Sequence, residues 1–193
     1  LPHLWLGTTY TDSDQAINSL RAARELQRQS CSVYFELGKR FEQAGDMALA
    51  RRTIRQSIEA APTYAIGLDQ LADYAQLDSE LVASERLRER ALEANPWYRI
   101  PARKLAQAAW DEGRLEAARK LLQDNLEHSE PIWTDHYLLG QIYAEEHRHE
   151  HARKHLETAR ELELDSREVL TALSRVYFAL GQTADARQLM EKL

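Results

Sequence analysis

One leucine recurs at a fixed interval of 34 residues along most of this chain. It is found, with no insertion to break the register, at Leu37, Leu71, Leu105, Leu139 and Leu173. The residue after each leucine is small, namely Gly38, Ala72, Ala106, Gly140 and Ser174. A second small residue follows at the same interval, at Ala50, Ser84, Ala118, Ala152 and Ala186. A period of 34 residues is typical of a helix–turn–helix unit that stacks on copies of itself.

The period divides the chain into units when Cys31 is taken as position 1. We expect four full units, 31–64, 65–98, 99–132 and 133–166, and a partial unit, 167–193. Residues 14–30 fit the second half of a further unit, so the repeat domain is expected to span 14–193. Glycine and proline are scarce, at seven and five residues, which suits an all-α protein. The prediction is a right-handed superhelical solenoid of antiparallel helix pairs, about 11 helices in all.

The turn inside each unit has its own signature. Three glycines share position 15, namely Gly45, Gly113 and Gly181. A left-handed glycine there ends the first helix of a unit. Ser79 and His147 occupy the same position in the other two units and are less suited to it. Pro62 and Pro96 share position 32, where we expect them to close the second helix.

This pattern resembles the tetratricopeptide repeat family, whose unit combines a large residue, Leu–Gly, an aromatic residue, Ala and Pro. Unit 133–166 shows the pattern at Leu139, Gly140, Tyr143, Ala152, Leu156 and Ala159. Arg88 departs from it, since it stands where a buried apolar residue is expected, and we expect Leu87 to take that role. His136 replaces a large apolar residue, and Ala75 and Ala109 replace aromatic ones, so looser packing is expected there.

Both ends of the chain are expected to be unfinished. Residues 1–13 lack the first helix that would complete the half unit 14–30. We expect them to be either an extended segment that covers the apolar end of the solenoid or the stub of an upstream domain. The chain begins with Leu1 rather than Met, which indicates a mature or excised fragment. Self-association through uncapped ends is a further expectation.

Charge and hydropathy exclude several classes of partner. The net charge of -6 indicates no general attraction to nucleic acid. No apolar run reaches the length that spans a membrane, so direct membrane insertion is not expected. Cys31 is the single cysteine, which excludes an intramolecular disulfide and leaves the compartment open between cytoplasm and periplasm.

Neither cofactor binding nor catalysis is expected of this chain. It has no glycine-rich nucleotide loop and no cysteine pair for zinc. Asp69 and Asp73 lie four residues apart on one helix face, but an open solenoid seldom provides the enclosed pocket that acid–base catalysis needs. We interpret the two carboxylates as an acidic patch in a groove.

A histidine-rich run, HRHEHARKH, ends at His155. His151 and His155 are four residues apart on an expected helix, which is a workable spacing for two metal ligands. Neighbouring cations, including Arg148 and Arg153, oppose a cation site, and no third ligand is suitably spaced. We therefore predict no metal site.

The resemblance also implies where a partner would bind. In tetratricopeptide proteins, positions 2, 5, 9, 12 and 13 of each unit commonly face a concave groove. Carried onto this chain, these positions predict a partner groove of Phe35, Lys39, Asp69, Asp73, Arg103, Gln107, Trp110, Tyr137, Gln141, Arg175 and Phe178, and they also include Glu145 and Thr171. Aromatic and Arg side chains of this kind often anchor partners. The family's clamp for a C-terminal carboxylate is not reproduced, because Phe35 and Lys39 occupy its places.

Two functional hypotheses follow from repeats without a catalytic constellation. The first is a protein–protein interaction scaffold that binds a peptide or partner protein in the concave groove. The alternative is an accessory or recruitment region of a larger bacterial envelope, polysaccharide-secretion or glycosyltransferase system, which the resemblance and the unfinished ends suggest. An enzyme is not expected, because function needs a site and none is visible in the sequence.

Overall fold

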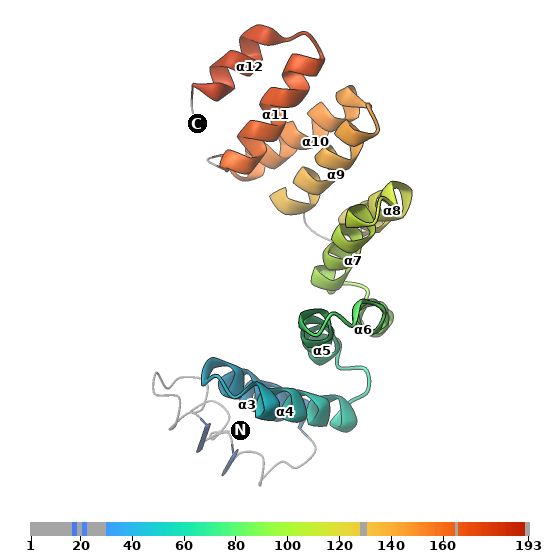
Figure 1. The fold of residues 1–193 in the computed structure, drawn as a ribbon, viewed down its shortest axis with the longest axis vertical. Coiled ribbons are helices and arrows are strands. Elements are labelled where there is room, and N and C mark those ends of the chain that lie inside the picture. The colour runs from blue at the N-terminus through green and yellow to red at the C-terminus, as the bar shows by residue number, and fades with distance from the viewer. Residues whose placement is uncertain (1–16, 19–20, 23–29, 128–130, 165, 192–193) are drawn as a thin grey trace. The chain divides into compact units, whose positions relative to one another are not determined.

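The structure is a computed structural model that describes residues 17–18, 21–22, 30–127, 131–164 and 166–191. Ten helices, α3 to α12, occupy most of these ranges, and the described ranges contain no strand (Figure 1). The all-α architecture predicted from the period is confirmed. The expected extended segment 1–13 and most of the half unit 14–30 lie outside the described residues. Ile17 is described, is helical and is buried against Leu37 and Phe41.

The chain divides into two compact units, Leu1–Pro101 and Ala102–Leu193, called unit 1 and unit 2 below. Unit 1 contains α3 (Cys31–Gln43), α4 (Met47–Ala60), α5 (Ala65–Leu77) and α6 (Leu81–Ala94). The division falls in the first turn of α7 (Arg99–Asp111). Unit 2 continues with α8 (Leu115–Glu127), α9 (Trp133–Glu145), α10 (His149–Leu162), α11 (Arg167–Ala179) and α12 (Thr183–Met190).

The residues that repeat every 34 positions form the contacts inside each helix pair. Leu37, Leu139 and Leu173 are fully buried, as is the small residue of each second helix from Ala50 to Ala186. In unit 2 these residues join Leu122, Ile142 and Leu156 in one hydrophobic core, because spacings of three and four keep them on one helix face. Helix α9 packs on α10 and α11 packs on α12 within this core.

The predicted left-handed turns are confirmed in all five 34-residue repeats. Gly45, Gly113 and Gly181 have φ values of 82°, 75° and 76°. Ser79 and His147 adopt the same conformation with φ values of 62° and 57°, although a Cβ is unfavourable there. The amide that follows each turn residue donates back to the first helix, as from Glu80 N to Ala75 O over 2.9 Å. This hydrogen bond satisfies a carbonyl that the helix end would leave unpaired.

The expectation for Arg88 and Leu87 is wrong. Arg88 is only 2% exposed and occupies the inner face of α6, whereas Leu87 is partly buried beside it. The charge is accommodated because α5 places three acceptors opposite it. Arg88 Nη2 donates to Asp73 Oδ1 over 2.9 Å and to Gln76 Oε1 over 2.6 Å, and Nε lies 3.6 Å from Asp69 Oδ1. A buried guanidinium is tolerated when it is paired in this way.

The left-handed turns provide a direct test of the register. We expect Ser79→Gly to raise the free energy of unfolding by about 1 kcal/mol, because glycine removes the Cβ penalty of a left-handed residue. Gly45→Ala is the matched reverse change and is expected to lower it by about the same amount. Urea denaturation followed by circular dichroism measures both. An unchanged midpoint for both variants would contradict the assignment of these turns.

Candidate functional site

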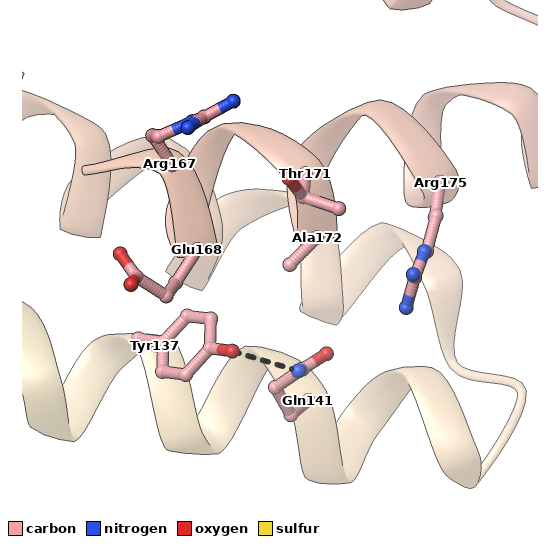
Figure 2. Close-up of a pocket in the computed structure, with 7 residues that line it drawn as sticks. All are labelled: Tyr137, Gln141, Arg167, Glu168, Thr171, Ala172 and Arg175. Atoms are coloured by element: carbon pink, nitrogen blue, oxygen red, sulfur yellow. Dashed lines mark hydrogen bonds between the residues drawn. The ribbon is translucent and has the colours of Figure 1, made fainter. Parts of the chain in front are cut away.

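Two adjoining cavities open along α9 and α11 in unit 2. Each has a volume of about 340 Å³. The first is lined by Tyr137, Gln141, Arg167, Glu168, Thr171, Ala172 and Arg175 (Figure 2). The second is lined by Trp110, Gln141, Ala144, Glu145, His149, Ala172, Arg175, Val176 and Ala179. Gln141, Ala172 and Arg175 line both, so the two cavities adjoin at these residues, and together they are called the α9–α11 groove.

The repeat explains why these side chains meet. Helices α9 and α11 are the first helices of successive 34-residue repeats, and they contact each other directly. Tyr137 and Gln141 are one turn apart on α9, and Thr171 and Arg175 are the residues at the same two unit positions on α11. Residues four apart lie on one face of a helix, so both helices direct these side chains into the space between them (Figure 2).

Hydrogen bonds already hold several groove side chains in place. Gln141 Nε2 donates to the Tyr137 hydroxyl over 3.1 Å. The Trp110 indole Nε1 donates to Glu145 Oε2 over 2.8 Å and so links α7 to α9. Backbone hydrogen bonding, and then the Ser166 hydroxyl, hold the pKa of the Glu168 carboxyl below its usual range. The groove therefore combines fixed aromatic rings with groups that keep spare hydrogen-bonding capacity.

Six of the predicted groove residues line the cavities, namely Trp110, Tyr137, Gln141, Glu145, Thr171 and Arg175. The other predicted residues of unit 2 do not. Gln107 Nε2 donates to Asp111 Oδ1 over 2.9 Å, and Phe178 is exposed outside the cavities. Arg103 Nε donates to Asp135 Oδ1 over 2.5 Å, and Asn125 Nδ2 donates to the other oxygen over 2.7 Å. Asp135 is fully buried, and its two hydrogen bonds join Arg103 of α7 and Asn125 of α8 to α9.

The predicted residues of unit 1 line neither of these cavities. Phe35 packs edge-on against Tyr64, with ring centroids 5.7 Å apart. Lys39 pairs with Glu42 and also donates to Gln70 Oε1 over 3.2 Å.

Asp69 corrects the interpretation of an open acidic patch. The residue is only 4% exposed, and its carboxylate accepts a hydrogen bond from the Tyr98 hydroxyl over 3.1 Å beside Arg88. Asp73 is more exposed but pairs with Arg88 over 2.9 Å. These two carboxylates, which were predicted to face a binding partner, therefore lie against the buried Arg88 guanidinium.

Sequence reasoning missed part of the groove. Seven lining residues were not predicted as part of a groove, namely Ala144, His149, Arg167, Glu168, Ala172, Val176 and Ala179. Ala144, Glu168 and Ala179 stand at groove positions of the repeat and could have been found by register alone. His149 belongs to the histidine run that was considered only for metal binding. Arg167, Ala172 and Val176 fall outside those positions, and no signal in the sequence indicated them.

The candidate metal ligands His151 and His155 lie in a stack of rings. Tyr143 contacts both, with ring centroids 5.2 Å from His151 and 5.4 Å from His155. His155 Nδ1 lies 3.0 Å from His136 Nδ1. His136, which replaces a large apolar residue of the family pattern, therefore has a hydrogen-bond partner in His155. Within the described ranges, no group of three or more His, Cys, Asp or Glu residues is arranged to hold a metal ion. Cys31 is a free, partly buried thiol at the start of α3.

The fold and the groove define a class of protein: an all-α repeat protein built from helix pairs, with a depression between successive first helices. Comparison with family models shows that the chain belongs to the tetratricopeptide repeat family. One model matches residues 11–65 and 137–193, which together exceed half of the chain, and a second matches residues 101–124. Proteins of this family generally mediate protein–protein interactions and are generally non-catalytic.

Solved structures agree on the fold. The chain is similar to PilW, a type IV pilus biogenesis factor, with a TM-score of 0.77 and 16% identity over 100% of this chain and 90% of that one. It is similar to the C-terminal part of a repeat protein from Cytophaga hutchinsonii, with a TM-score of 0.76, 13% identity and 99% and 76% coverage. YrrB, described as having an unusual peptide-binding site, matches with a TM-score of 0.70, 14% identity and 90% and 89% coverage. A comparison with curated proteins returned no match.

None of the described helices is long and apolar enough to cross a membrane.

The histidine pair predicts an acid-sensitive stability. Burial, and then the neighbouring imidazoles of His136 and His151, lower the pKa of His155 to about 4. An unfolded histidine titrates near pH 6.5. Between these two values the unfolded chain binds more protons than the folded one, so stability is fully present above about pH 6.5 and is lost as the pH falls towards 4.

We expect His155→Leu to flatten the dependence of the unfolding free energy on pH within that window, because one of the depressed titrations is gone. Denaturant unfolding at a series of pH values measures the slope. His147→Asn, which removes an exposed imidazole in the preceding turn, is the matched control. A slope for His155→Leu as steep as that of the unaltered protein would contradict the assignment.

Proposed function

We propose that unit 2 is a binding module that holds an extended segment of a partner protein in the α9–α11 groove. The observation that carries this proposal is that two cavities of about 340 Å³ each adjoin at three shared residues. A ligand long enough to occupy both must run along the groove past Gln141 and Arg175. An extended peptide has this form, whereas a small compact ligand would fill only one cavity.

The groove chemistry suits a peptide. Tyr137 and Trp110 offer large rings with few rotatable bonds, and such side chains commonly anchor a partner. Both rings are already held by hydrogen bonds to Gln141 and Glu145, so binding need not immobilise them. Gln141 and Thr171 provide neutral groups between the rings that can pair with a peptide backbone.

The comparisons support binding rather than catalysis. The family generally mediates protein–protein interactions, and YrrB is described as having a peptide-binding site. An accessory role in a larger bacterial envelope system remains the second proposal, since PilW is described as a pilus biogenesis factor. Both proposals use the same groove and differ in the assembly to which the bound partner belongs.

A variant that fills the groove tests the proposal. We expect Thr171→Trp to lower the recovery of crosslinked partners from native lysate at least about tenfold, because the added ring occupies the first cavity. Arg187→Gln is the matched control, since Arg187 is exposed on α12 and lines neither cavity. Circular dichroism confirms that both variants are folded. Equal recovery by Thr171→Trp and the unaltered protein would contradict groove binding.

A further inference from the structure

We infer that the ligand of the α9–α11 groove carries a carboxylate that binds Arg175, with an apolar side chain beside it. This inference rests on the proposed function and names the chemistry of the bound segment.

Arg175 occupies the middle of the groove. It lines both cavities and is exposed on α11, and its side chain extends toward α9 beside Gln141 (Figure 2). Within the described part of the chain it has no hydrogen-bond or ion-pair partner. The neighbours one turn away on α11 are Thr171, Ala172, Phe178 and Ala179, none of which is acidic. The guanidinium is therefore available to a ligand.

Another arginine of unit 2 shows how a surface cation can be satisfied within the chain. Arg153 on α10 pairs with Glu150 over 2.9 Å and with Glu157 over 3.4 Å, one turn before and one turn after it. Such i,i+3 and i,i+4 pairs satisfy a surface cation locally. Arg175 has no such ion pair among the described residues. It lies in a concave site, where a ligand can contact it.

The carboxylates near Arg175 are already engaged. Glu145 accepts from the Trp110 indole over 2.8 Å, and Glu168 accepts from the Ser166 hydroxyl over 2.9 Å. Gln141 directs its amide nitrogen to Tyr137 and keeps its oxygen as an acceptor. An anionic group from outside the chain is therefore the best counterpart for Arg175, and a carboxylate matches the planar donors of a guanidinium.

The second cavity indicates what accompanies the carboxylate. Besides Arg175 it is lined by the polar side chains of Gln141 and Glu145. The other lining residues present mostly apolar surface, namely Trp110, Ala144, Ala172, Val176 and Ala179. His149 also lines it, and its buried Nδ1 has no hydrogen-bond partner among the described residues. An apolar side chain next to the acidic residue would fill this cavity.

Selection from a displayed library of random peptides tests the inference with five forms of the protein, one of which is the groove-filling variant Thr171→Trp. The unaltered chain and Arg187→Gln are expected to enrich peptides with Asp or Glu at one fixed position beside an apolar residue. Arg187 is the matched control, because it too is exposed and has no partner within the described residues. Arg175→Gln is expected to lose the acidic preference, and Arg175→Glu to select Lys or Arg instead. A synthetic peptide of the consensus sequence is expected to bind Arg175→Gln at least about tenfold more weakly.

Two other outcomes separate this inference from the proposed function. Loss of peptide binding by Thr171→Trp would show that the peptides lie in the groove. If those peptides had no acidic position, or if Arg175→Gln selected the same acidic position, the inference alone would be overturned. Failure to enrich any peptide, or enrichment of the same peptides by Thr171→Trp, would overturn both the inference and groove binding.

Discussion

The contact between one small residue on each first helix and one large residue on its second helix controls the geometry of this protein. A Cβ built on Gly140 would lie 2.5 Å from Leu156 Cγ, and one built on Gly38 would lie 2.6 Å from Ile54 Cδ1. The large side chain of α10 or α4 thus fills the space that a side chain on the partner helix would need. Because each pair is held together on this face, other faces of the first helices are left for neighbouring units and for ligands. The α9–α11 groove lies between two such first helices.

Most of the fold could be predicted because the repeat expresses local steric rules. The period repeats a leucine and a small residue within each helix pair and a left-handed residue at each turn. One register therefore predicted the helix pairs and the positive φ of Ser79 and His147. Arg88 could not be predicted in this way. Its burial depends on three acceptors, Asp69, Asp73 and Gln76, which α5 places opposite it and which the family pattern does not contain.

The groove was predictable only in part, for a related reason. Register states which residue stands at a groove position, but an open groove also depends on what neighbouring side chains do. Arg103 and Asp69 stand at groove positions and are used by buried partners, Asp135 and Arg88. Tyr137 and Arg175 stand at equivalent positions and line open cavities, because small residues such as Ala172 lie between them. The distinction arises from tertiary packing, which a one-dimensional period does not encode.

Photo-crosslinking tests most directly whether a partner segment lies in the α9–α11 groove. A photoreactive phenylalanine analogue replaces Thr171 in the groove and, in a separate sample, replaces exposed Lys154 on α10, which lines neither cavity. Mass spectrometry of the crosslinked partner is predicted to find one contiguous segment joined to position 171 and little product at position 154. Efficient crosslinking at position 154 with none at position 171 would contradict the account.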